Sequence, residues 1–371
     1  MQFDLTDEQQ ELVSFVRELL TQRSDSGAVR AVMGTPDGFD RGLWAVLCGE
    51  IGAASLAIPE EFGGAGFSSY ETHLVLEELG YALTPSPFLA SAILATQALL
   101  VANNSEASTR LLPGIADGSH IATLAWAAPD GRWRPDQIGV DATPNGESWS
   151  LSGEVPLVAY GAQADTLLVI ARTSAGVALF EITGESGVTR EETSAMDPTL
   201  RFTTVRLTEA QGREVAAGGT IDLELLRARV LTAVSALQVG TAARGLDMTL
   251  AYAGQRVQFG RTIGSFQVVK HRLADMYVQL ETARTASRAA AWAVANDSDD
   301  VTELARIAKV WCSRALDFVA SETVQLHGGI AITWEHDAHL VFKRAHATAQ
   351  LFASPSEVRR EVEESLLAAS A

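Results

Sequence analysis

Cysteine and positive charge are scarce in this sequence. The two cysteines, Cys48 and Cys312, lie far apart, which excludes a disulfide framework or the clustered thiolates of a zinc site. We expect both to be buried small hydrophobic residues. Asp and Glu (46) outnumber Lys and Arg (28), and the formal net charge is −18. This charge argues against nucleic acid or an anionic membrane as a partner, because both favour a basic protein face.

A long apolar run is also absent. The most apolar stretch, residues 89–102 (LASAILATQALLVA), is too short to span a membrane and contains Ser91, Thr96 and Gln97, so it predicts a core helix. The chain begins MQFDLTDEQQELV, which is acidic and lacks the basic and apolar regions of a signal peptide. We therefore expect a cytoplasmic protein.

The patterns along the 371 residues predict an α+β protein of three domains. Residues 1–120 are mainly helical, beginning with a capping box of Thr6 and Gln9. Residues 121–215 contain short β-forming runs between Gly, Pro and Asp clusters, which predict a β domain of short antiparallel strands. Residues 216–371 contain long helical patterns, including one of about ten turns, and predict a four-helix bundle.

Three motifs lie in order within this architecture: IPEEFGGAGFS at residues 58–68, QRVQFGRTIGSFQVVKHRLADM at 255–276 and QLHGG at 325–329. With them, the sequence resembles the acyl-CoA dehydrogenase family over nearly its full length. The resemblance implies an enzyme that uses FAD to oxidise an acyl-CoA between Cα and Cβ, and that passes electrons to an acceptor. In this family a carboxylate removes the α-proton, and each FAD lies across a dimer interface.

The resemblance assigns one group of residues to the FAD of a neighbouring subunit. Arg256 would face the pyrophosphate, where a guanidinium forms charge-assisted hydrogen bonds. The other residues are Gln258, Phe259, Gln325 and the Gly328–Gly329 turn, whose backbone can approach a nucleotide closely. The structural alternatives are a solvated Arg at a helix end, a core Phe and a glycine helix cap.

The residues that would hold the chain's own flavin differ from the family pattern. Residues 127–134 read AAPDGRWR, in which Pro129 anchors the alignment and Arg132 and Trp133 replace small residues. The family's Trp-Ile-Thr, which packs on the flavin and bonds to it, aligns with Leu157, Val158 and Ala159. We expect these exchanges to remove room and hydrogen bonds for a flavin.

The catalytic base is also expected to be missing. Its usual position in the final loop aligns with Ala353, which is followed by Ser354 and Pro355. In some members the base is on the first bundle helix instead, at a position that aligns with Val230. Neither Ala353 nor Val230 can accept a proton.

Nearby carboxylates have other interpretations. Glu357 fits a helix start in which Ser354 is the N-cap, and Glu335 matches a family residue that is not the base. Glu224 lies six residues before the helix position, roughly 9 Å at about 1.5 Å per residue, and is the main rival.

No metal site is expected. His336 and His339 lack a third nearby ligand, so we interpret them as surface or supporting residues.

These features predict the non-catalytic subunit of a heteromeric α2β2 acyl-CoA dehydrogenase, paired with a paralogous catalytic subunit. The family resemblance suggests a bulky substrate such as a steroid side-chain CoA. Two alternatives stay open. One is a self-sufficient homotetramer with Glu224 as a relocated base, and the other is a non-redox acyl-CoA-binding scaffold.

Overall fold

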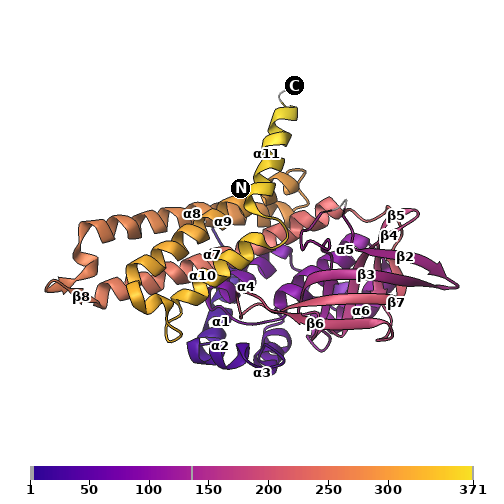
Figure 1. The fold of residues 1–371 in the computed structure, drawn as a ribbon, viewed down its shortest axis with the longest axis horizontal. Helices are drawn as coiled ribbons and strands as arrows, with labels where there is room; N and C mark the ends of the chain where they lie inside the picture. The colour runs from indigo at the N-terminus through magenta and orange to yellow at the C-terminus, as the bar shows by residue number, and fades with distance from the viewer. Residues whose placement is uncertain (1–3, 135–136, 370–371) are drawn as a thin grey trace. The chain divides into compact units, whose positions relative to one another are not determined.

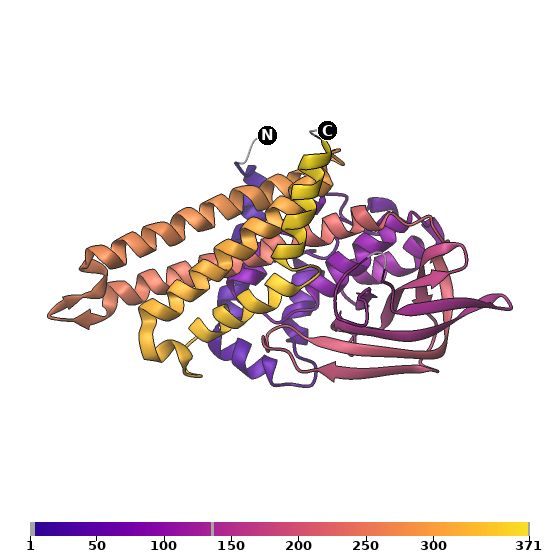
Figure 2. The same ribbon diagram turned by 45° about the horizontal axis from the view of Figure 1, so that its top comes forward.

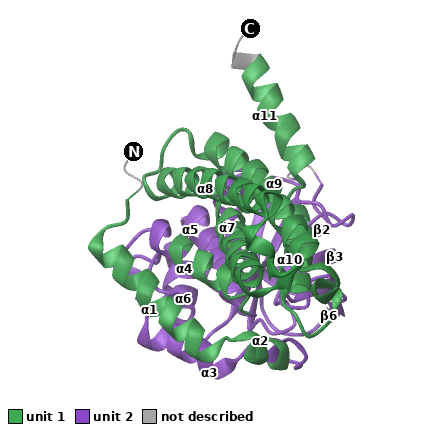
Figure 3. Ribbon diagram, turned by 90° about the vertical axis from the view of Figure 1, so that its left-hand side faces the viewer, with its two compact units in different colours: residues 1–31, 73–84, 231–371 green, residues 32–72, 85–230 purple. Residues whose placement is uncertain are grey.

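The computed structural model describes residues 4–134 and 137–369, which fold into two compact units. The first unit contains residues 1–31, 73–84 and 231–371, and the second contains residues 32–72 and 85–230 (Figure 3). Among the helices of these described residues, none is long and apolar enough to cross a membrane.

Short helices make up the N-terminal third of the chain. The predicted capping box begins α1: the backbone N–H of Gln9 donates to the Thr6 hydroxyl, and the Gln9 side chain accepts from the Thr6 N–H. The predicted core helix at 89–102 is buried along most of its length, first as a π-helix and then as α5. The helices are α1 (Asp7–Arg23), α2 (Ser26–Met33), α3 (Arg41–Ala45), η1 (Val46–Glu50), η2 (Glu60–Phe62), α4 (Ser69–Tyr81), η3 (Leu89–Ala95), α5 (Thr96–Ala102) and α6 (Ser105–Ala116).

The sheet of the second unit confirms the predicted antiparallel β domain in most of its pairings and departs from it in two respects. Strands β3 and β7 are long. Strand β4 pairs in parallel with β1, and also with β2 at one residue pair. Register shifts at Leu151–Gly153 and Val155–Val158 bend β3, which allows it to stay paired with β7 over most of its length. Strands β4, β2, β3, β7 and β5 pair in a closed ring. The strands are β1 (Ala122–Ala125), β2 (Val140–Asn145), β3 (Ser148–Ala159), β4 (Thr166–Thr173), β5 (Gly176–Ile182), β6 (Val188–Thr193) and β7 (Phe202–Ala216).

Long helices form the bundle of the first unit, as predicted (Figures 1 and 2). The 33-residue α7 is followed by a short β hairpin, and α9 packs against α8, α10 and α11. The elements are α7 (Leu223–Gln255), β8 (Val257–Gln258), β9 (Arg261–Thr262), η4 (Ile263–Ser265), α8 (Gln267–Ala295), α9 (Val301–His327), η5 (Gly328–Ile332), α10 (Ala338–Gln350) and α11 (Pro355–Ala369).

Glycine lets α4 approach α7 closely. A Cβ on Gly240 would lie 1.8 Å from the backbone oxygen of Glu77, and one on Gly80 would lie 2.5 Å from that of Leu237. Thr241 also donates its hydroxyl to the Gly80 carbonyl at 3.1 Å. Because no larger residue fits at either glycine, this contact fixes how α4 lies on α7.

Polar side chains are buried inside the bundle. Lys309 on α9 is fully buried and donates from Nζ to the Thr348 carbonyl in the last turn of α10, at 2.6 Å. Gln238 on α7 donates to the Ser313 hydroxyl at 3.0 Å. Cys312 and Cys48 are both buried thiols, as predicted, and burial raises the pKa of each.

Candidate functional site

Arg256 directly follows α7 and begins the hairpin. Its backbone N–H donates to the Tyr252 carbonyl, and its own carbonyl accepts from the Ile263 N–H, both at 2.8 Å. The residue is exposed, and within the described residues its guanidinium forms no ion pair. The hairpin therefore holds the backbone of Arg256 and leaves its charged group available to a ligand.

The tip of the hairpin exposes an aromatic ring. Phe259 and Gly260 both have positive φ, 55° and 74°, as a two-residue type I′ turn requires. Phe259 is 91% exposed, which excludes the alternative of a core Phe. Its ring meets Phe266 edge-on at 6.2 Å, and the Arg261 guanidinium lies 3.9 Å from the centre of the Phe266 ring. Gln258, beside this cluster, is exposed.

The second group of predicted residues ends α9. Gln325 is exposed in the last turn, and Gly328 has φ 65° and ψ −143°, a backbone conformation that favours glycine. A Cβ on Gly328 or Gly329 would meet no described atom within 4 Å. Tight packing therefore does not account for these glycines, and open space lies beside their backbone.

The structure brings these two groups to one end of the bundle. Tyr252, one turn before Arg256, stacks on His327, which directly precedes Gly328, with ring centres 4.4 Å apart. One turn earlier, the hydroxyls of Thr249 and Thr323 are hydrogen-bonded at 3.1 Å. Figures 1 and 2 show the hairpin and the end of α9 at the same end of the first unit.

This surface has the chemistry that a phosphorylated nucleotide needs. An exposed guanidinium suits a pyrophosphate, an open glycine turn admits close approach, and an exposed aromatic ring can cover a base or sugar. The residues present therefore fit one side of an FAD molecule. A separate open groove of about 550 Å³ is lined by residues of α7, β9, η4 and α8, and Thr262, Ser265 and Lys270 provide its polar lining.

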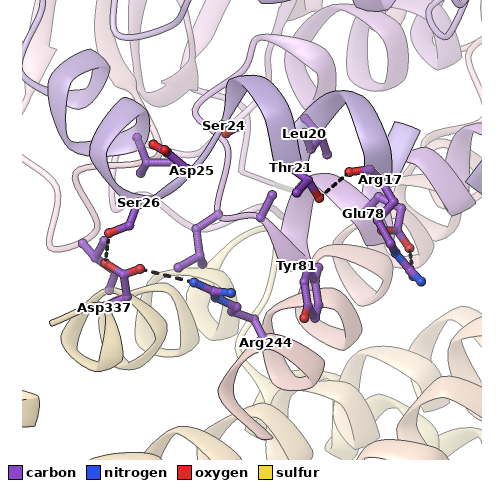
Figure 4. Close-up of a pocket in the computed structure, with 14 residues that line it drawn as sticks. Arg17, Leu20, Thr21, Ser24, Asp25, Ser26, Glu78, Tyr81, Arg244 and Asp337 are labelled. Atoms are coloured by element: carbon purple, nitrogen blue, oxygen red, sulfur yellow. Dashed lines mark hydrogen bonds and ion pairs between the residues drawn. The ribbon is translucent and has the colours of Figure 1, made fainter. Parts of the chain in front are cut away.

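A smaller cavity of about 200 Å³ lies among α1, α2, α4, α7 and α10 (Figure 4). Arg17 forms a two-bond ion pair with Glu78 at 2.9 and 2.6 Å. Asp337 accepts from the Ser26 hydroxyl at 2.6 Å and from Arg30 at 2.8 Å, with Arg244 at 3.4 Å.

Asp337 is held ionised within this junction. Burial opposes its charge, but the hydrogen bonds from Ser26 and Arg30 and the charges of Arg30 and Arg244 outweigh burial, so the pKa of Asp337 lies below its ordinary value. Because Arg17 pairs with Glu78, Arg244 lies beside Asp337, and Asp25 accepts from the Ala28 N–H, we interpret the cavity as a structural junction between helices.

The residues that align with a flavin pocket lie in the second unit and pack on one another. Trp133 is buried against Trp126, with ring centres 4.9 Å apart. Leu157, at φ 56°, brings its Cδ1 to 3.3 Å from where a Cβ on Gly131 would lie.

The segment that aligns with the family's Trp-Ile-Thr, residues 157–159, has no hydrogen-bonding side chain. Val158 and Ala159 are buried aliphatic residues. Arg132, expected to fill the pocket, is exposed beside Asp130, so the steric part of that expectation rests on Trp133 alone. The residues at these positions fit a flavin poorly.

The candidate base positions are placed as follows. Ala353 and Val230 are buried aliphatic residues. Glu224 is exposed in the first turn of α7. The Glu357 carboxylate accepts from the Ser354 N–H at 3.1 Å and from its hydroxyl at 2.8 Å, which confirms the predicted helix start. Glu335 is exposed.

The two histidines considered as metal ligands have other contacts. His336 Nδ1 accepts from the Ala338 N–H at 3.2 Å, and the His339 ring lies 4.7 Å from that of Trp334. No group of three His, Cys, Asp or Glu side chains in the described ranges could hold a metal ion. Sequence reasoning missed the ring contacts of Tyr252, His327 and His336, because nothing in local spacing relates Tyr252 to His327.

Comparison with known proteins gives matches along almost the whole chain. Residues 6–119 match the family model described as acyl-CoA dehydrogenase, N-terminal domain, and residues 220–362 match acyl-CoA dehydrogenase, C-terminal domain. Acyl-CoA dehydrogenase IpdE2 of Mycobacterium tuberculosis is 38% identical over 357 residues, covering 96% of each chain.

Two solved structures of assemblies are also similar. A chain of the ChsE4–ChsE5 complex from Mycobacterium tuberculosis is 30% identical, with a TM-score of 0.89 and coverage of 99% of both chains. A chain of a variant of the Tcur3481–Tcur3483 steroid ACAD is 28% identical, with a TM-score of 0.87 and coverage of 98% of this chain and 99% of that one.

Proposed function

Because the chain belongs to the acyl-CoA dehydrogenase family, we propose that it is one subunit of a heteromeric FAD-dependent acyl-CoA dehydrogenase. In this proposal it contributes the surface for the FAD pyrophosphate and adenosine to a paralogous partner. The partner supplies the catalytic carboxylate and an intact flavin pocket. The chain alone is then inactive in acyl-CoA oxidation.

The observation that carries the proposal is the pairing of Arg256 with the Gly328–Gly329 turn. Both lie exposed at one end of the bundle, and the hairpin that follows Arg256 exposes Phe259 at its tip. A scaffold that only bound acyl-CoA would have no need for a pyrophosphate-binding guanidinium beside an open glycine turn. This arrangement therefore favours a cofactor role over the scaffold alternative.

Bound FAD would supply the hydride-accepting chemistry, and this chain would bind and orient its nucleotide end. Arg256 would hold the pyrophosphate through charge-assisted hydrogen bonds. Gln258 and Gln325 would offer side-chain amides, and the glycine turn would allow backbone contact. None of these groups needs to exchange a proton with the substrate.

The residues at the flavin and base positions support the division of labour between two different subunits. In the alignment with the family, Trp133 takes a position that accommodates the flavin, and Ala353 and Val230 take the two usual positions of the base; all three side chains are buried. A subunit that contributes only to its partner's site needs neither a flavin pocket nor a catalytic base of its own. The homotetramer alternative requires Glu224 to act as the base, although it is exposed at the start of α7.

The similar assemblies suggest the partner and the substrate class. The ChsE4–ChsE5 complex contains two different proteins, and the Tcur3481–Tcur3483 assembly is described as a steroid ACAD. We propose a paralogous dehydrogenase as the partner and a bulky acyl-CoA, such as a steroid side-chain CoA, as the substrate. An electron-transfer protein would then reoxidise the FAD.

Substitution of Arg256 tests this proposal in the co-expressed complex. Loss of charge-assisted hydrogen bonds worth about 1.5–3 kcal/mol should weaken FAD binding by roughly tenfold to a hundredfold in Arg256→Ala. Arg314→Ala removes an exposed positive charge further back on α9 and should retain wild-type FAD affinity. Glu224→Gln should retain turnover. Normal FAD affinity in Arg256→Ala, or lost turnover in Glu224→Gln, would contradict the proposal.

A further inference from the structure

Three aromatic rings join the two parts of the candidate FAD surface. Tyr252 from α7 stacks on His327, the last residue of α9, at 4.4 Å and an interplanar angle of 28°. The His327 ring also lies 4.5 Å from that of His336, which precedes α10. We call Tyr252, His327 and His336 the ring column. It connects the turn before Arg256 with the residue before Gly328.

Hydrogen bonds define the neutral form of His327. Its Nδ1 lies 2.7 Å from the Thr323 carbonyl, which can only accept, so Nδ1 carries the proton. Its Nε2 is buried and has no hydrogen-bond partner in the described part of the chain. A second proton would therefore be placed on a buried nitrogen with no acceptor, which is costly.

His336 is held neutral through a different contact. Its Nδ1 accepts from the backbone N–H of Ala338, at the first residue of α10. Protonation of Nδ1 would replace this hydrogen bond with two opposed N–H groups. It would also place a positive charge at a helix N-terminus, where cations are unfavourable.

Charged groups from several elements surround His336. Arg30 on α2 and Arg244 on α7 disfavour its charged form, while the adjacent Asp337 favours it. Asp337 is already engaged by hydrogen bonds from Ser26 and Arg30. These donors partly offset the negative charge of Asp337 that would otherwise favour the protonated form of His336.

His339 on α10 lies among similar groups. Burial lowers the pKa of His339, Lys343 and Arg30 lower it further, and Asp337 opposes the shift. Cations thus face this part of the chain from α2, α7 and α10, with Asp337 as the acidic group among them.

The electrostatic balance agrees with the hydrogen-bond pattern. Burial lowers the pKa of His327, and the nearby His336 adds to this effect, although the bond to Thr323 opposes it. Burial likewise lowers the pKa of His336. Both rings are thus neutral above the ordinary histidine value of 6.5, and charging both would set two cations in adjacent rings.

We infer that the ring column is a proton-sensitive positioning element, whose neutral rings hold the glycine turn beside Arg256 and whose protonation separates them. The link to FAD rests on the proposed function. Acid should then release FAD from the partner's site, because the turn and Arg256 no longer face the cofactor together. Linkage limits the effect to about tenfold in affinity per pH unit for each ring whose protonation accompanies release.

The test uses the co-expressed complex and measures its FAD dissociation constant between pH 5 and 8. A double variant, His327→Phe/His336→Asn, keeps an aromatic ring in the column and an oxygen acceptor for the Ala338 N–H, but cannot titrate. His271→Phe on the exposed face of α8 is the matched control. We expect acid release in the wild type and in His271→Phe, and a flat profile in the double variant.

Amide hydrogen exchange of residues 324–340 in the same complex separates the inference from the proposed function. Corrected exchange in this segment should rise below pH 6.5 in the wild type and stay flat in the double variant. If the segment opens in this way but FAD affinity does not follow, the column acts as inferred and the proposed FAD surface is wrong. If the wild type does not open, or the double variant opens equally, the inference is wrong. A single variant, Tyr252→Leu, removes the stacking partner and should raise exchange at all pH values.

Discussion

Replacement of the buried Lys309 should change how the stability of the protein depends on pH. Lys309 is fully buried on α9, and burial lowers the pKa of its ammonium group from 10.5 to about 7. Between these values the unfolded chain binds a proton that the folded protein does not. The free energy of unfolding of the wild type should therefore rise with pH across this window.

The magnitude follows from the size of the window. One such proton adds about 1.4 kcal/mol per pH unit, so the gain from pH 7 to pH 10 is about 4 kcal/mol. Lys309→Met should lack this gain, and it should also lose the 2.6 Å bond to the Thr348 carbonyl at every pH. The free energy of unfolding of the wild type minus that of Lys309→Met should therefore increase by about 4 kcal/mol from pH 7 to pH 10.

Urea denaturation followed by tryptophan fluorescence, at pH 7, 8, 9 and 10, would measure this difference. Groups that titrate in both proteins cancel, which leaves the contribution of Lys309. Lys270→Met on the exposed surface of α8 is the control and should keep the wild-type slope. A constant difference between wild type and Lys309→Met from pH 7 to pH 10 would refute the reasoning.

Three further substitutions test the packing and charge of the first unit. Gly240→Ala places a Cβ 1.8 Å from the backbone oxygen of Glu77 and should lower the free energy of unfolding, measured by denaturation, by about 1–3 kcal/mol or more. In the control Gly254→Ala, the added Cβ has no described atom within 4 Å, and the free energy of unfolding should rise by about 0.5–1 kcal/mol. Equal effects of the two substitutions would contradict the close contact of α4 and α7. Asp337→Asn should destabilise the protein at neutral pH, because Asp337 has a lowered pKa and contributes stability above the unfolded value of 3.8. The loss of stability in Asp337→Asn should become smaller as pH falls through the pKa of Asp337 in the folded protein. If thermal melts show the same loss at acidic pH as at neutral pH, the ion-pair interpretation is wrong.

Sequence periodicity was sufficient for the elements that bury a continuous apolar face. The long helical patterns at residues 221–257, 266–295 and 301–326 correspond to α7, α8 and α9 within one or two residues at each end. Local capping chemistry was equally informative, since Thr6 with Gln9 and Ser354 with Glu357 each begin a helix as expected. These features depend only on residues within a few positions of one another.

The β sheet was less predictable because its pairing depends on distant residues. Strand β2 contains Pro144 and has alternate exposed polar residues, and β6 reads VTREET, so neither resembles a buried strand. Strand direction leaves no trace in periodicity, and the parallel pairing of β1 with β4 was therefore not foreseen.

The candidate site was predictable as a set of residues but not as an arrangement. Its motifs identified Arg256 and the glycine turn, whereas the exposure of the Phe259 ring depends on a hairpin turn with positive φ. The contact of Tyr252 with His327 joins residues 75 positions apart in the chain. Arg132 faces solvent beside Asp130, and no local pattern distinguishes that outcome from burial.

Flavin content measured by visible absorbance tests the central claim most directly. The chain should be purified alone and after co-expression with its paralogous partner. The account predicts a colourless chain alone and one FAD for each pair of different chains in the complex. One FAD per chain in the protein purified alone, together with oxidation of an acyl-CoA, would contradict it and make Glu224 the first residue to substitute.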